Sequence, residues 1–196
     1  MAQIFDEILV RGVRAGQIPA RTQDAREWFR NKARESRSNA RYPANIMDSS
    51  AKVGTVEPGN MYHFFYDPKT KSDLPYYDKF PLIFMVDTAP KGFYGINLHY
   101  LPPKLRAVLM DNLYAVASNK RYDESTKLRI SYDLLKGASK YRYFKPTFKH
   151  YLTDHVKSRF VKIDSVEWDI ALFLPTERFE KAGKSRVFAD SRKAIQ

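Results

Sequence analysis

The residues best suited to recognition or chemistry lie in the stretch DPKTKSDLPYYDKFP, residues 67–81. Tyr76 and Tyr77 offer flat aromatic faces, and Asp73 and Asp78 offer hydrogen-bond acceptors. Prolines interrupt the stretch, so it is predicted to be a long connection between two strands. Small barrels often bind peptides through aromatic side chains in such connections. One interpretation is therefore a recognition loop that contacts a partner.

The preferred interpretation of this loop is structural. A connection of this length needs an apolar anchor, and Tyr76, Tyr77 and Phe80 would supply one by folding back as a lid on the body. Asp78 would then accept hydrogen bonds from nearby backbone, as short acidic side chains in loops commonly do. Under this interpretation the loop completes the fold and carries no reaction.

Neither the histidines nor the acidic residues have the spacing of a catalytic or metal site. His63 and His99 fall in separate predicted strands and could be neighbours, but two imidazoles lack the third ligand that zinc requires. His150 and His155 are five residues apart, so they do not share a helical face. The common nucleotide-binding, zinc-protease and serine-hydrolase motifs do not occur. We therefore expect no enzyme, no metal and no cofactor.

Arginines form the second candidate contact. Five of them are spaced three or four apart and would form one stripe if a helix beginning near Thr22 continued: Arg26, Arg30, Arg34, Arg37 and Arg41. Such a stripe suits phosphates. The stretch KYRYFKP, residues 140–146 with Arg142, interleaves basic and aromatic side chains as single-strand binders do. Arginine is also enriched at protein interfaces, and a protein interface is the preferred interpretation.

Composition indicates a basic protein with a substantial core. The chain has 196 residues, 43% of them hydrophobic, a formal net charge of +12 and no cysteine. Residues 11–41 contain nine basic and three acidic residues, which is half of the charge excess. Such an excess attracts polyanions or acidic protein surfaces. No apolar run approaches the ~20 residues that span a bilayer, and no signal peptide is evident, so we expect a soluble protein made inside the cell without a membrane partner.

The expected elements give an α+β fold. Residues 54–101 alternate strand-like runs with turns, which predicts a small SH3-like β-barrel or a bent antiparallel sheet. Proline and helical spacing predict a packed helical subdomain after it. Helices are expected at 22–36, from Pro102, over 127–137 with Gly137 as its end, from Pro146, after a capping box at Asp164, and from Thr176. The helix from Pro146 rests on a stripe of Phe148, Leu152, Val156 and Phe160. The predicted segments are a basic N-terminal arm (1–52), the barrel (54–101), the helical subdomain (102–175) and a basic C-terminal tail (176–196).

Two stretches, MYHFFYDPKTKSDLPYYDKFPLIF and GFYGINLHYLPPKLRAVLM, carry a family resemblance. They resemble small structural proteins of contractile-tailed phages of the T-even-like group, over roughly residues 54–118. The resemblance implies a virion component in the tail, baseplate or neck. It implies no active residues.

Together these observations predict a non-enzymatic virion assembly protein. Its extended basic termini would dock on other virion structural proteins in a symmetric hetero-oligomeric assembly, formed in the host cytoplasm, and could also meet phage DNA. The alternative is a nucleic-acid-binding protein that uses the arginine stripe and the aromatic side chains. A hydrolase or nuclease without a recognisable motif is the third hypothesis.

Overall fold

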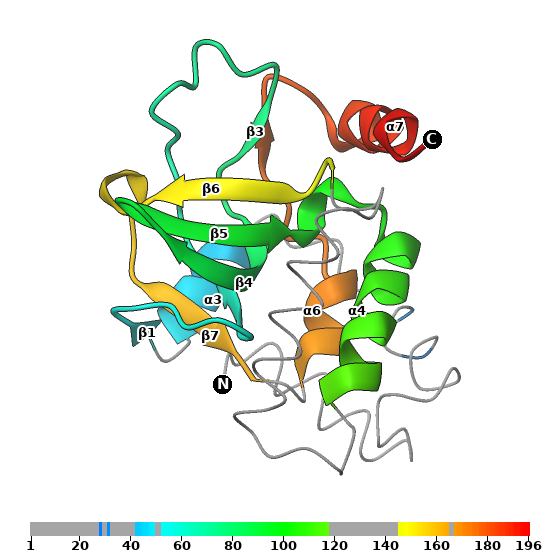
Figure 1. Cartoon of the computed structure of the whole chain (residues 1–196), viewed down its shortest axis with the longest axis horizontal. Coiled ribbons are helices and arrows are strands. Elements are labelled where there is room, and N and C mark those ends of the chain that lie inside the picture. The colour runs from blue at the N-terminus through cyan, green and yellow to red at the C-terminus, as the bar shows by residue number, and fades with distance from the viewer. Residues whose placement is uncertain (1–27, 29–30, 32–41, 50–51, 118–144, 165–166) are drawn as a thin grey trace.

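The computed structural model describes residues 28, 31, 42–49, 52–117, 145–164 and 167–196 (Figure 1). Its centre is a six-stranded antiparallel sheet in the order β1-β7-β2-β4-β5-β6. The strands are β1 (Lys52–Val53), β2 (Met61–His63), β4 (Leu82–Ala89), β5 (Gly92–Asn97), β6 (Phe148–Leu152) and β7 (Phe160–Ile163). A second, two-stranded antiparallel sheet joins β3 (Tyr77–Asp78) to β8 (Phe179–Glu180).

Helices surround this sheet. They are α3 (Tyr42–Ser49), α4 (Pro103–Ala117), α6 (Trp168–Phe173) and α7 (Lys184–Ile195), with the 3-10 turns η2 (Leu98–Tyr100) and η3 (Thr153–His155). In Figure 1, α4 and α6 lie side by side, and α7 lies near the start of α4, where the guanidinium of Arg106 is 6.0 Å from the centroid of the Phe188 ring. Among the described residues, none of the helices has both the length and the apolar character needed to cross a membrane.

The central strand β4 is buried on both faces because alternate side chains enter two different core clusters. Leu82 and Phe84 join the larger cluster, which also contains residues of α3, α4 and α6. Ile83 and Met85 join the smaller cluster, which is rich in tyrosine and phenylalanine. The predicted burial of this strand on both faces is confirmed. A strand in this position needs the continuous apolar run that the sequence provides.

Buried Arg106 connects α4 to the chain that follows α6. Its Nε donates to the carbonyl of Leu101 at 2.7 Å, and Nη1 donates to the carbonyl of Leu172 at 3.0 Å. Its guanidinium also lies 3.7 Å from the carboxylate of Glu177. Burial alone would raise the pKa of Glu177, but the charge of Arg106 holds that pKa below its usual value. The arginine therefore fixes the start of the C-terminal segment against α4.

The α+β class and the antiparallel sheet are confirmed, whereas the barrel is not. In the described part of the chain, β1 and β6 are the two edges of the large sheet and do not pair with each other. The sheet is therefore open. Nothing in the strand order supports an SH3-like arrangement.

The helix predicted from Pro146 is wrong, because residues 148–152 and 160–163 form β6 and β7. The stripe of four-residue spacing was coincidental. Phe148, at one end of that stripe, is 37% exposed, whereas Tyr151, outside it, is buried. The free edge of β5 supplies backbone partners to β6 along its whole length. This long-range pairing outweighs a weak local pattern.

The prediction of extended basic termini is not confirmed. The helix expected from Thr176 is wrong, because that residue is buried and β8 follows it. Residues 184–195 form α7, whose Val187 and Ile195 are buried. Near the other end, α3 occupies a stretch expected to be irregular, and its Ile46 is fully buried. These apolar side chains find partners in the chain's own core.

The remaining helix predictions have different outcomes. The helix near residue 168 exists as α6. The capping box predicted from Asp164 includes residues 165 and 166, which lie outside the described residues, so it stays a prediction. The helix from Pro102 is confirmed as α4. The helix predicted over 127–137 lies outside the described residues.

Candidate functional site

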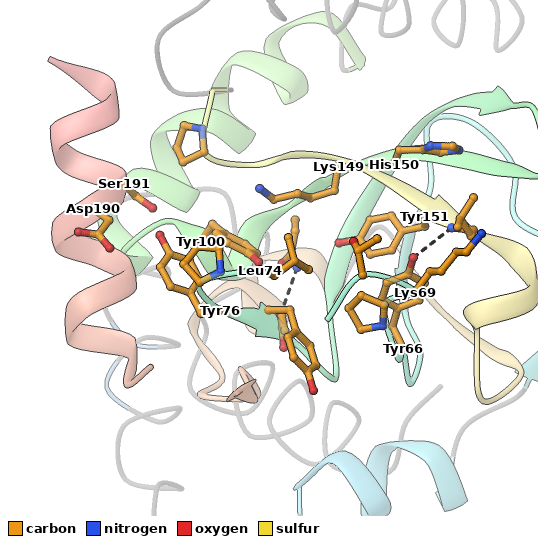
Figure 2. A pocket seen from close by; sticks show the side chains of 18 of the residues that line it. Tyr66, Lys69, Leu74, Tyr76, Tyr100, Lys149, His150, Tyr151, Asp190 and Ser191 are labelled. Atoms are coloured by element: carbon orange, nitrogen blue, oxygen red, sulfur yellow. Dashed lines mark hydrogen bonds between the residues drawn. The ribbon is translucent and has the colours of Figure 1, made fainter. Parts of the chain in front are cut away.

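A cleft lies between the loop after β2, the edge strand β6 and helix α7 (Figure 2). Its volume is about 500 Å³, within the range of roughly 300–1,000 Å³ typical of small-ligand sites. Its walls are mostly aromatic. Five tyrosines line it: Tyr66, Tyr76, Tyr77, Tyr100 and Tyr151.

The loop that forms one wall is held in place at its base and near its tip. The backbone N–H of Tyr66 donates to the carbonyl of Lys79 at 3.0 Å and closes the base. Lys181, which follows β8, donates from Nζ to the carbonyls of Ser72 at 2.8 Å and Leu74 at 3.0 Å. Pairing of β3 with β8 adds a third attachment. The tyrosines on this loop are therefore presented by a fixed backbone.

A buried polar network lies behind the cleft. The carboxylate of Asp78 accepts from His99 Nδ1 at 2.7 Å and from the Asn97 side-chain amide at 3.2 Å. Its other oxygen accepts from the backbone N–H of Arg178 at 3.1 Å. His99 Nε2 lies 2.9 Å from the hydroxyl of Thr176. The network joins the loop, η2 and the C-terminal segment, so it positions three sides of the cleft at once.

This network has the connectivity of a nucleophile–base–acid triad, with Thr176, His99 and Asp78 in the three roles. Burial excludes that use in the folded state, since Thr176 and His99 are both 0% exposed and neither lines the cleft. Although burial alone would raise the pKa of Asp78, its pairing with His99 and its backbone hydrogen bonds lower that pKa. Asp78 is therefore a carboxylate at neutral pH with a structural role.

The aromatic walls remain neutral. The rings of Tyr76 and Tyr100 lie 6.0 Å apart between centroids and are tilted by 38°. Burial raises the pKa of Tyr76, Tyr100 and Tyr151, so all three hydroxyls are protonated at physiological pH. They offer flat apolar faces and polar tips, the combination that suits planar ligands with polar edges.

Positive charge accompanies these rings. Lys149, on β6, has its Nζ 4.4 Å from the centroid of the Tyr100 ring, and burial lowers the pKa of this lysine. Lys69 lies exposed on the opposite loop. Helix α7 adds exposed Arg186, whose Nε lies 3.9 Å from the carboxylate of the lining residue Asp190. The cleft is thus aromatic within and basic at its rim, apart from the carboxylate of Asp190.

The structure brings only part of the predicted contact set to this site. Tyr76 and Tyr77 line the cleft, and their role in contacting a partner stays a prediction. Asp78 accepts from the backbone N–H of Phe80 at 3.1 Å, which confirms that it bonds nearby backbone. Six predicted contacts lie outside the described residues: Arg26, Arg30, Arg34, Arg37, Arg41 and Arg142.

The two histidines expected to be neighbours are neighbours. The rings of His63 and His99 lie 5.7 Å apart between centroids. His63 Nδ1 pairs with the carbonyl of Pro81 at 3.1 Å, and its ring stacks on Phe80. Within the described ranges, no group of three histidine, cysteine or acidic side chains is arranged to hold a metal ion.

Sequence reasoning missed several lining residues because they come from distant segments. Tyr100 ends η2, Lys149 and Tyr151 lie on β6, and Ser191 lies on α7. Along β6, exposed Phe148 and His150 alternate with Lys149 and Tyr151. This alternation is a strand signal that could have placed Lys149 and Tyr151 on one face. No local signal could have placed β6 opposite α7.

Comparison with known families identifies the family of the chain. A family model described as the phage T4 terminal DNA protecting protein matches residues 9–193. The chain belongs to this family. No curated protein and no solved structure matches it.

This family corrects the function expected from sequence. The link to T4-like phages is confirmed, but a tail, baseplate or neck assembly protein is wrong, because the family is named for the protection of terminal DNA. The nucleic-acid alternative agrees better with the family than the assembly role does.

Proposed function

We propose that this protein binds the ends of linear phage DNA and shields them from exonucleases. The observation that carries the proposal is the family match over residues 9–193, with its description as a terminal DNA protecting protein. The net charge of +12 supports it, because each phosphate neutralised by lysine or arginine releases condensed counterions from DNA.

The described structure offers a surface with the required chemistry. Helix α7 borders the tyrosine-lined cleft and carries exposed Arg186, Arg192 and Lys193. Basic side chains beside aromatic faces suit a nucleic acid whose phosphates and bases are both accessible. A DNA end offers both, since its last base pair has an uncovered face.

Protection in this proposal is by occupancy and involves no reaction on the DNA. An exonuclease must reach the terminal nucleotide, and a protein seated there blocks it for as long as it stays bound. The buried positions of His99 and Thr176 support a binding role over a hydrolytic one. The protein would act wherever the phage DNA has free ends, in the virion or in the host cytoplasm.

The direct test is degradation of linear duplex DNA by an exonuclease that works from duplex ends. Full-length protein should lengthen the lifetime of the duplex in proportion to the fraction of DNA ends that it occupies. It should leave cleavage of the same DNA by an endonuclease unchanged. Equal slowing of both nucleases would show general coating of DNA, and no slowing of the exonuclease would refute the proposal.

A further inference from the structure

The cleft beside α7 has the size and enclosure for one nucleotide. Its volume of about 500 Å³ is bounded by the loop after β2, by β6 and by α7 (Figure 2). Duplex DNA cannot enter a space of this class, which matches small-molecule sites. A single nucleotide that has left its stack can enter it, as happens in enzymes that extrude a base into a pocket.

The walls suit the flat faces of a base. Tyr76 is only partly buried, whereas Tyr100 is 7% exposed and its ring lies against Lys149 Nζ at 4.4 Å and against the ring of Tyr76, so Tyr76 supplies the face on which a base can stack. Base stacking on aromatic side chains tolerates any sequence, because every base has a π-face. A protein that must hold any end it meets needs this tolerance.

An unpartnered hydroxyl marks where the polar edge of the ligand would lie. Ser191 is 1% exposed, lines the cleft from α7, and its Oγ makes no hydrogen bond within the described structure. Figure 2 shows this hydroxyl on the side of α7 that faces Tyr100. Buried hydroxyls normally have a partner, so a vacant one in a cleft points to a ligand atom.

The charges orient the nucleotide. Asp190 lines the cleft with its side chain 39% exposed, and a carboxylate repels phosphate but accepts hydrogen bonds from the amino groups of bases. Lys69 and Lys149 also line it, and Lys69 is exposed. The base edge therefore belongs near Asp190 and Ser191, and the phosphate belongs near the lysines.

We infer that this cleft captures the last nucleotide of one DNA strand, with its base against Tyr76 and its phosphate near Lys69 and Lys149. The inference rests on the proposed function and specifies its site. A terminal nucleotide is stacked on one side only, so removing it from the duplex costs less than removing an internal one. The DNA strand also continues from a terminal nucleotide on one side only, whereas it continues on both sides of an internal nucleotide. A one-nucleotide cleft thus distinguishes an end from the interior of a duplex.

The test measures end preference as the ratio of the dissociation constants for a minicircle and for a linear duplex of the same sequence. Wild-type protein should prefer the linear duplex. Replacing the terminal nucleotides of the linear duplex by abasic ones should weaken its binding about tenfold, through lost stacking on Tyr76. This measurement needs no variant and is independent of any folding defect.

Two substitutions complete the experiment. Tyr76→Ala should lower the end preference about tenfold while leaving minicircle binding unchanged. Phe148→Ala truncates an exposed aromatic side chain on β6 that does not line the cleft. It should change neither the end preference nor the affinity for the minicircle. Circular dichroism melting curves would confirm that both variants fold.

The outcomes separate the two proposals. No end preference in wild-type protein would refute the proposed function itself. An end preference that ignores both the abasic terminus and Tyr76→Ala would refute only the cleft as the site. Loss of the preference in Phe148→Ala alone would assign the contact to the exposed face of β6, where the rings of Tyr94 and Phe148 stack 5.2 Å apart, and would also overturn the inference.

Discussion

At the scale of single residues, the buried polar side chains hold the cleft together more than any surface contact does. The Asp78–His99–Thr176 network and the Arg106–Glu177 pair both fix the segment that leads into β8. Buried polar groups of this kind are costly to leave without partners. Substitutions that leave one of these buried groups without its partner should therefore have large effects on stability.

Arg106→Met should lower the free energy of unfolding by about 3–5 kcal/mol, because it keeps most of the side-chain volume but leaves the carboxylate of Glu177 buried beside an apolar group. Urea denaturation would measure the loss. Lys184→Met is the matched control, since Lys184 lies 3.5 Å from the same carboxylate but is 54% exposed. It should cost less than about 1 kcal/mol. Equal losses in the two variants would contradict a special role for the buried arginine.

His63 should make the fold sensitive to mild acid. Burial, followed by the nearby charge of His99, lowers its pKa from 6.5 to about 3, so the unfolded chain binds a proton below pH 6.5 that the folded chain does not. Stability contributed by neutral His63 is therefore complete above pH 6.5 and is lost as the pH falls toward 3. The expected slope is about 1.4 kcal/mol per pH unit within this window.

Urea denaturation at several pH values would measure this slope. His63→Asn retains a polar group near the carbonyl of Pro81 but does not titrate, so its stability should depend less on pH between 6.5 and 4. An unchanged slope in the variant would assign the acid sensitivity to other groups. The pKa of Asp78 is lowered by His99 despite burial. Protonation of Asp78 should therefore add to the loss of stability only at pH values below its ordinary pKa of 3.8.

At the scale of elements, the edge strand β6 is the part on which the cleft depends most. It contributes Lys149 and Tyr151 to the lining and is held through its pairing with β5. That pairing needs a glycine at position 92, because a Cβ there would lie 1.9 Å from the carbonyl oxygen of Tyr151. The requirement arises from the close approach of two backbones.

Gly92→Ala should displace β6 and lower the free energy of unfolding by about 1–3 kcal/mol, since the clash is with backbone that cannot rotate away. Thermal or urea denaturation would detect it. Gly54→Ala is the control, because a Cβ at that position meets nothing within 4 Å. A neutral result for Gly92→Ala would mean that β6 can shift without cost and that the cleft is less rigid than described.

At the scale of the whole molecule, the net charge of +12 sets how DNA affinity depends on salt. The logarithm of the affinity should fall linearly with the logarithm of salt concentration, by about 0.9 for each phosphate contact. Replacing Arg186, Arg192 and Lys193 of α7 by glutamine should therefore reduce the slope by up to about 3. Fluorescence anisotropy across a salt series would measure it.

The matched control removes three charges from the opposite edge of the sheet. Lys52, Arg159 and Lys162 are exposed on or next to β1 and β7, which lie at the other end of the strand order from β6. Their replacement by glutamine should leave the slope almost unchanged. Equal reductions in both triple variants would show that DNA binds by diffuse attraction and not along α7.

Several features of the fold follow from local sequence. The apolar run of β4 predicted a strand buried on both faces, and Pro102-Pro103 with the helical spacing after it predicted α4. The alternation in MYHFFY correctly placed Met61 and Tyr62 on opposite faces. Each of these signals is complete within one segment, because propensity and periodicity act over a few residues.

The cleft could not be predicted in the same way, although Tyr76 and Tyr77 were singled out as contacts. Its other walls come from β6 and α7, which sequence reasoning assigned to a helix and to an extended tail. Both assignments failed because the deciding partners, the edge of β5 and the core around Val187, lie far away in sequence.

By itself the sequence determined a basic chain with an α+β core, because charge and short-range periodicity are local properties. Only the tertiary structure decided that the sheet stays open, that α7 packs on the core, and that tyrosines and lysines from three distant segments share one cleft. The physical reason is that backbone pairing and apolar burial between remote segments contribute more free energy than local preference.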